Sequence, residues 1–350
     1  MLFLKKKNLF ALDVGSYSIK LVELKPLKKG YQLVNLAIAP LPPEAIVDGA
    51  LMDPSAIAEA ITTLVGSVKG KTTDVATSVA GHSVIIKKIT LAAMTEDELA
   101  DSIQWEAEQY VPFDIADVNL DFEILGPDPA DESQMEVLLV AAKKEIIDDY
   151  TAVLAEAGLN PVVMDIDAFA CQNMLEINYS LAEGEAVAVV NIGASLSNIN
   201  IIKDGLSLFT RDVANGGGQF TEEIAKRFGL SYEDADAAKL GRKVEGADPD
   251  EVKAVIQESC DSFSAEIART LDFFMATNPD DNVSKVYICG GGAKVRNLDK
   301  VMSDKLGMHV EVANPFNAIS SGKAFDGQYL SDVGPSFGVA VGLAIRTEGD

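Results

Sequence analysis

The residues best placed to do chemistry are an aspartate or asparagine and small residues around a glycine, and this arrangement occurs twice. Residues 9–25 read LFALDVGSYSIKLVELK and residues 187–203 read VAVVNIGASLSNINIIK. The two segments align without a gap, so Asp13 matches Asn191 and Gly15 matches Gly193. Each copy reads as an apolar strand, a tight glycine turn and a second strand, which predicts a β-hairpin.

A glycine turn with small neighbours leaves backbone N–H groups exposed at the hairpin tip, and such a concave set of donors binds anions. A single turn of this kind is weak evidence, because most glycine turns are only turns and Asp13 could simply cap one. Two copies that face each other could hold a polyphosphate from both sides. The repeat therefore predicts a phosphate-binding cleft between two halves of the chain.

The elements that must position these turns follow an α/β order. Third strands at Tyr31–Ala39 and Leu206–Val213 make each repeat a meander, and helices alternate with strands after each meander. The stretch 84–160 interrupts the first half with a strand–helix–strand–strand–helix pattern, which is a small α+β subdomain. The last helix is expected from Pro335 to Ile345.

Composition excludes several classes of function. The chain has 350 residues, enough for about two lobes, and a formal net charge of −25, so nucleic acid is not an expected partner. Three scattered cysteines and two distant histidines argue against a disulfide framework, a zinc site or Ser-His-Asp chemistry. No apolar run reaches the ~18 residues of a membrane span, and the N-terminal lysines follow the apolar residues, the wrong order for a signal peptide. A cytoplasmic protein is expected.

The order of the glycine motifs resembles that of a known superfamily. Asp13-x-Gly15, Asn191-x-Gly193 and the run Gly290–Ala293 are similar to the phosphate-1, phosphate-2 and adenosine motifs of the actin, Hsp70 and sugar-kinase fold. The segments 216–224 and 235–239 resemble the helix pair that lines the adenine pocket in bacterial actin relatives.

Further segments resemble the family of the type IV pilus assembly protein PilM. They are Trp105–Phe113 (WEAEQYVPF), Asp121–Glu123 (DFE), Asn314–Phe316 (NPF) and Gly342–Arg346 (GLAIR). The resemblance implies a duplicated, actin-like (ribonuclease H-like) ATPase fold with two lobes and an inserted subdomain of the FtsA 1C type. The implied subdomains are 1A (1–83, 161–186 and 335–346), 1C (84–160), 2A (187–217 and 285–334) and 2B (218–284).

The same resemblance implies an ATP and Mg²⁺ site. Asp13 would hold Mg²⁺ through water, and the small residues of the two hairpins would cradle phosphates, with Lys20 nearby. Lys239 and Glu223 would edge the adenosine, and the glycine run would let the nucleoside lie flat on the backbone. The cofactor-binding residues implied are Asp13, Gly15, Ser16, Ser18, Lys20, Gly193, Ala194, Ser197, Gly217, Glu223, Lys239, Gly290, Gly291, Gly292 and Ala293.

The resemblance also implies partners. The family binds the short cytoplasmic N-terminus of the inner-membrane protein PilN. This peptide is expected to bind in a groove near Trp105, Tyr110 and Phe113, and PilN would hold the chain at the inner membrane. Trp105 lies off the apolar stripe of its helix, so it either covers this groove or packs on a neighbouring strand. The pilus motor ATPase, the platform protein and a second copy of the chain are further expected contacts.

One departure from the family pattern concerns catalysis. Asn191 stands where the family has Asp, and an amide carries no negative charge and cannot act as a base. We therefore expect ATP to bind, with slow or absent hydrolysis. Two alternatives remain: an FtsA-like filament protein and a small-molecule kinase. The chain ends without the basic amphipathic helix of FtsA relatives, and no general base for a kinase stands out.

Overall fold

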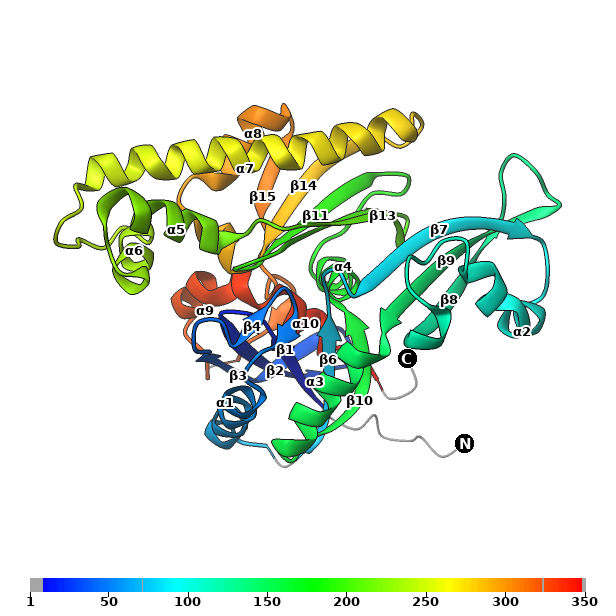
Figure 1. The fold of residues 1–350 in the computed structure, drawn as a ribbon, viewed down its shortest axis with the longest axis horizontal. Helices are drawn as coiled ribbons and strands as arrows, with labels where there is room; N and C mark the ends of the chain where they lie inside the picture. Colours follow the sequence, from blue (N-terminus) through cyan, green and yellow to red (C-terminus); the bar gives the residue numbers. More distant parts are fainter. Residues whose placement is uncertain (1–8, 71, 323, 348–350) are drawn as a thin grey trace.

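The computed structural model describes residues 9–70, 72–322 and 324–347, and it has two lobes, each built around a mixed sheet (Figure 1). The first sheet has the strand order β10-β6-β1-β2-β3-β16. Its strands are β1 (Phe10–Val14), β2 (Ser18–Pro26), β3 (Tyr31–Pro40), β6 (Asp74–Val79), β10 (Asn160–Ile166) and β16 (Ile319–Ser320).

The second sheet repeats this topology. Its order is β13-β12-β11-β14-β15, which matches β3-β2-β1-β6-β10 strand for strand in sequence order and in direction of pairing. The strands are β11 (Ala186–Ile192), β12 (Ser197–Lys203), β13 (Leu206–Val213), β14 (Val283–Cys289) and β15 (His309–Val312). The predicted duplication and the α/β class are confirmed.

The first sheet is apolar on both faces because helices cover both. Along β1, Phe10 and Leu12 pack with α1 (Pro54–Ser67) and α3 (Lys144–Glu156), whereas Ala11 between them packs with α4 (Asp167–Asn178) and α10 (Gly338–Leu343). Successive side chains of a strand point to opposite faces, so a strand covered on both sides reads as a continuous apolar run. Burial of each large side chain such as Leu12 contributes about 2 kcal/mol.

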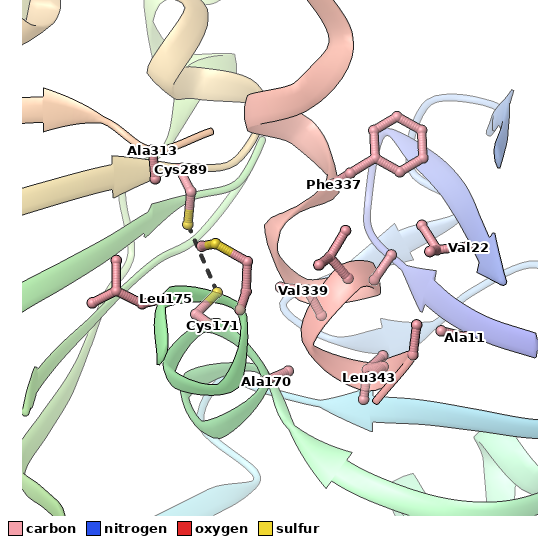
Figure 2. Packing of buried hydrophobic residues seen from close by; sticks show 14 of the residues in the cluster. Ala11, Val22, Ala170, Cys171, Leu175, Cys289, Ala313, Phe337, Val339 and Leu343 are labelled. Atoms are coloured by element: carbon pink, nitrogen blue, oxygen red, sulfur yellow. Dashed lines mark hydrogen bonds between the residues drawn. The ribbon is translucent and has the colours of Figure 1, made fainter. Parts of the chain in front are cut away.

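Helices α4 and α10 belong to both lobes. Their cluster includes strand residues of the first sheet, such as Ala11 and Val22, and of the second, such as Val187 and Cys289. Figure 2 shows Cys171 of α4 and Cys289 of β14 pointing toward each other, with the sulfur atoms 3.7 Å apart. All three cysteines are free, as their scattered positions predict, and all three are buried.

Four helices complete the second lobe. α5 (Gly217–Phe228), α7 (Pro249–Thr277) and α8 (Leu298–Leu306) cover the sheet face opposite α4, and α6 (Tyr232–Lys239) packs beside α5. The long helix α7 runs across the top of Figure 1. It begins where Asp248 caps two backbone N–H groups and Pro249 takes the first position.

The inserted segment forms a three-stranded antiparallel sheet with its own core. Its order is β7-β9-β8, with β7 (Val84–Ala92), β8 (Val118–Pro127), β9 (Gln134–Lys143) and the helix α2 (Glu96–Ala107). Helix α3, which the expected range 84–160 includes, packs instead on α1 and on the core of the first sheet through Val153 and Leu154. The full division into four subdomains stays a prediction.

The C-terminal helix α10 is shorter than the expected Pro335–Ile345, and several short elements were not predicted from the sequence. The Pro335 carbonyl accepts a hydrogen bond from the Gly290 N–H, so the chain makes a 3₁₀ turn before α10 begins at Gly338. Strand β15 has only four residues, two of them polar. The remaining elements are β4 (Ile46–Val47), β5 (Ala50–Leu51), η1 (Ile115–Asp117), η2 (Gly291–Lys294), η3 (Gly334–Phe337) and α9 (Gly327–Val333).

The contact between α4 and α10 requires a glycine. A Cβ on Gly342 would lie 1.7 Å from the Ala170 carbonyl oxygen. We expect Gly342→Ala to lower the free energy of unfolding by about 3 kcal/mol, because the helices must separate to admit the methyl group. Chemical denaturation measures this change.

Gly66, near the end of α1, provides the matched control. A Cβ there meets nothing within 4 Å, so Gly66→Ala should stabilise the protein by about 0.5–1 kcal/mol through helix propensity. A Gly342→Ala protein as stable as the native one would show that the two helices are not held at this distance.

Candidate functional site

A cavity of about 290 Å³ lies between the two lobes and is lined by both repeats. Both hairpin tips, the start of α5, the end of α6 and the turn after β14 contribute to it. The expected residues that line it are Asp13, Gly15, Ser16, Ser18, Lys20, Asn191, Gly193, Ala194, Gly217, Lys239, Gly290, Gly291 and Gly292.

The first hairpin presents an ion pair to the cavity. Asp13 and Lys20 face each other across the β1–β2 ladder, and the lysine Nζ lies 3.2 Å from Asp13 Oδ2. At the matching positions of the second hairpin, Asn191 faces Asn198. The two walls therefore share a backbone shape but differ in charge.

The tips of the two hairpins touch. Ser195 Oγ donates a hydrogen bond of 3.0 Å to Ser16 Oγ, which joins the second lobe to the first. A further contact between the lobes runs from the Gly81 N–H to Asp212 Oδ2 at 2.9 Å. The two lobes on either side of the cavity are thus in direct contact at the hairpin tips and at Gly81.

The glycines around the cavity have two different structural roles. The N–H groups of Gly217 and Gly218 donate to the carbonyls of Gly193 and Ala194 at 2.8 Å, so the start of α5 rests on the second hairpin and Gly217 cannot also donate to an anion. Gly290 has φ +86°, and its Cβ would lie 2.3 Å from the Ile192 carbonyl oxygen.

Gly292 is equally constrained, since its Cβ would lie 2.3 Å from Ile192 Cγ2. Gly291 differs, because it is exposed and its Cβ would meet only Ser336 Oγ, at 3.9 Å. Within the run, therefore, Gly290 and Gly292 serve the packing of the protein on itself, and Gly291 is the one with open space on the cavity side.

Three expected residues do not line the cavity. The buried hydroxyl of Ser197 donates to the Asn215 carbonyl at 2.6 Å. Ala293 is buried in the core of the second lobe, and Glu223 is exposed on α5. Lys239 does line the cavity, where Asp236 at 2.6 Å, Thr221 Oγ1 at 2.7 Å and the Gly217 carbonyl at 3.2 Å hold its ammonium group.

Asp167, which no sequence motif singled out, is an acid of the cavity whose pKa is strongly raised. It is the first residue of α4, and Ser78 Oγ donates a 2.6 Å hydrogen bond to it. Its exposed surface faces the cavity, and loss of solvent, followed by the charge of Asp13, raises its pKa to about 7. An acid with this pKa can take or give a proton at neutral pH.

A second cavity of about 270 Å³ adjoins the first. Its walls include Val84–Lys87 of β7 and Thr210–Asp212 of β13, which are edge strands of their sheets. It shares Gly81, His82 and Asn198 with the first cavity. The inserted sheet and the second lobe therefore meet beside the interlobe cavity.

The three residues of the expected partner groove lie in different environments. Trp105 is 74% exposed, whereas Tyr110 and Phe113 are partly buried against the core of the inserted sheet. Lys143 Nζ lies 4.6 Å from the centre of the Phe113 ring. None of the three lines either cavity described above.

The duplicated sheets and the cavity between their hairpins define a protein of the actin-like ATPase fold. Two distant matches show this fold: the ethanolamine utilization protein EutJ from Carboxydothermus hydrogenoformans (TM-score 0.60, 16% identity, 98% of this chain and 90% of that one) and MreB5 of Spiroplasma citri bound to AMPPNP (TM-score 0.55, 14% identity, 97% and 96%).

The family follows from two further matches. The model of the type IV pilus assembly protein PilM matches residues 11–348, so the chain belongs to the PilM family. A chain of the PilM–PilN type IV pilus biogenesis complex is similar to it with a TM-score of 0.87 and 30% identity, over 98% of this chain and 99% of that one. Among the described residues, no helix combines the length and apolar composition needed to cross a bilayer.

The raised pKa of Asp167 predicts a pH-dependent stability. Because its pKa in the folded state is about 7, above the usual value of 3.8, its stabilising contribution is complete below about pH 4 and is lost as pH rises through 7. Asp167→Asn cannot ionise, so we expect it to be more stable than the native protein at pH 8, by on the order of 1–3 kcal/mol, and not at pH 4.

Thermal unfolding between pH 4 and 8 tests this expectation, with Glu223→Gln on the exposed face of α5 as a charge-matched control. An Asp167→Asn protein whose stability relative to the native one is the same at both pH values would rule out a proton held at this site.

Proposed function

We propose that this chain is an ATP-binding adaptor of the type IV pilus inner-membrane assembly platform, which binds the cytoplasmic N-terminal peptide of PilN. The observation that carries the nucleotide half of this proposal is the cavity closed by two repeated hairpins whose tips touch. The partner half is supported by the 30% identity to a chain of the PilM–PilN complex over nearly the whole chain.

The cavity suits a nucleoside polyphosphate in size and in the charged groups that it offers. Its volume of about 290 Å³ is close to the lower end of the usual range for small-molecule sites. Three lysines, Lys20, Lys239 and Lys294, line it and could contact phosphate, although the four carboxylates of Asp13, Asp48, Asp167 and Asp236 line it as well. A bound Mg²⁺ would offset the charge of such carboxylates. Polyphosphate would lie between the hairpins, with the nucleoside toward Lys239 and Gly291.

Asp13 is the residue proposed to hold Mg²⁺ through water. Its carboxylate lines the cavity beside Lys20, and carboxylate oxygen and water are the ligands that Mg²⁺ prefers. When bound, Mg²⁺ supplies positive charge that neutralises the phosphate oxygens. Lys20 would contact phosphate from the same wall.

Nucleotide would act on the whole molecule by favouring closure. A ligand that contacts both hairpins binds a closed cleft more tightly than an open one and shifts the population toward closure. The second cavity lies between β7 and β13 and shares residues with the first. Closure would therefore change the surroundings of the inserted sheet, where we place the partner.

Hydrolysis would be slow because Asn191, which stands where the family has Asp, carries no negative charge and cannot accept a proton. Asp167 remains as a group in the cavity that can accept a proton in its ionised form. The position of Asp167 in the cavity favours the alternative of a small-molecule kinase, because an ionised Asp167 could deprotonate a substrate hydroxyl as well as a water.

Substitution of the amide tests this account of hydrolysis. Asn191→Asp restores a carboxylate to the second wall, and we expect it to release phosphate from Mg-ATP about tenfold faster than the native protein. Asp167→Asn should remove the activity of both. If Asn191→Asp is no faster than native, the amide is not what limits hydrolysis.

The PilN peptide is proposed to bind beside the inserted subdomain. Trp105 is the one residue of the expected groove with most of its side chain accessible, so it is the group that a peptide can cover. Through this partner the chain would sit in the cytoplasm at the inner membrane. The motor ATPase, the platform protein and self-association stay expected contacts.

Peptide titration tests the adaptor function. We expect a labelled peptide from the cognate PilN N-terminus to bind with micromolar or better affinity in the presence of Mg-ATP, and more weakly with ADP or no nucleotide. Trp105→Ala should weaken binding about tenfold, or about 1.4 kcal/mol, through loss of buried aromatic area. Fluorescence anisotropy measures these affinities.

Phe273→Ala provides the matched control, because Phe273 is an exposed aromatic residue (54%) on α7, outside the inserted segment. Equal affinity in all three nucleotide states would refute the coupling. No binding in any state would refute the adaptor function and favour the filament or kinase alternative.

A further inference from the structure

One large side chain stands at the tips of the two hairpins. Tyr17 follows Gly15 and Ser16, and its counterpart in the second repeat is Ser195. Tyr17 lines the interlobe cavity, yet 49% of its surface is exposed. Its ring therefore lies where the cavity opens to solvent.

The Tyr17 side chain crosses from the first lobe to the second. Its hydroxyl donates a hydrogen bond of 3.3 Å to Asp236 Oδ2 on α6. The other carboxylate oxygen of Asp236 is held by Lys239 Nζ at 2.6 Å and by Thr221 Oγ1 at 3.3 Å. Contacts within the second lobe therefore hold the Asp236 carboxylate in place, independently of its hydrogen bond with Tyr17.

The Tyr17 backbone is equally well fixed in the first lobe, because its carbonyl accepts the Leu41 N–H at 3.0 Å. Burial, and then the negative charge of Asp236, raise the pKa of Tyr17, so the hydroxyl keeps its proton and remains a donor at neutral pH. At 3.3 Å the hydrogen bond to Asp236 is long for a hydroxyl donor, so it can break and form again at little cost in free energy.

We propose that Tyr17 and Asp236 form a strap across the mouth of the interlobe cavity, which must part whenever a nucleotide enters or leaves. The proposal rests on the nucleotide binding argued above and adds a function in the control of exchange. Because the hydrogen bond of the strap joins the two lobes at the opening of the cavity, it obstructs passage in both directions. Its loss should raise the association and dissociation rates together and leave the affinity nearly unchanged.

Stopped-flow kinetics with a fluorescent N-methylanthraniloyl-ATP and Mg²⁺ test the strap. Tyr17→Ser, which installs the residue of the second hairpin, should raise both rate constants about tenfold and change Kd by less than about threefold. Tyr17→Phe keeps the ring and loses only the hydroxyl, so its rates should rise about threefold. Tyr329→Ser, at an exposed tyrosine on α9 that does not line the cavity, should keep native rates.

Native rates in Tyr17→Ser would overturn the strap while leaving nucleotide binding intact. Absence of nucleotide binding by the native protein would instead refute the proposed function. Hydrogen exchange without nucleotide tests the strap in that case as well. Tyr17→Ser should then speed amide exchange in the first hairpin tip and in α6 by about tenfold, and unchanged exchange there would overturn the proposal.

Discussion

The close contact between α4 and α10 is the constraint on which the rest of the structure depends. These two helices are buried between the two sheets, and their cluster draws residues from both. Gly342 lets α10 approach the Ala170 carbonyl, and Gly338 lets it approach the Cys289 sulfur, where a Cβ would lie 3.1 Å away. The lobes are therefore joined by tightly packed apolar residues at one end.

This joint determines where chemistry can occur. A dense apolar core resists movement, whereas the hairpin tips are joined by a few polar contacts such as that between Ser16 and Ser195. The first residue of α4 is Asp167, so the helix that joins the lobes also brings its acid to the cavity. Asp167 and the apolar residues that join the lobes thus belong to the same helix, α4.

The sequence predicted the parts of the site that lie on the repeated backbone. Gly15, Gly193 and their neighbours were found because a gapless repeat places equivalent turns at equivalent ends of two sheets. The glycine run after β14 was found as well, although only Gly291 has open space, and Gly290 and Gly292 are required by contacts with Ile192. A pattern of small residues cannot distinguish room for a ligand from room for the protein itself.

The contacts that the sequence did not reveal arise through tertiary structure. Asp167 is an ordinary helix residue in the sequence, and it meets Asp13 because the parallel strands β10, β6 and β1 end at the same edge of the first sheet. Asp236 lies in the segment 235–239 that was expected near the nucleotide, but its contact with Tyr17 exists only because the two lobes face each other. Ser197 was expected in the cavity because it follows the second glycine turn. One position along a strand reverses the direction of a side chain, and its hydroxyl caps the Asn215 carbonyl instead.

The two copies of the repeated hairpin share a backbone shape but differ in the charge of their side chains. The ladder positions that carry Asp13 and Lys20 in the first hairpin carry two neutral amides, Asn191 and Asn198, in the second. When the cleft opens, the amides of the second hairpin move away from the ion pair of the first, and no ion pair between these positions is broken. A cation drawn to Asp13 would consequently travel with the first lobe, and the second hairpin could swing away with little electrostatic work. The two hairpins therefore match in backbone shape, and at these positions only the first one carries charge.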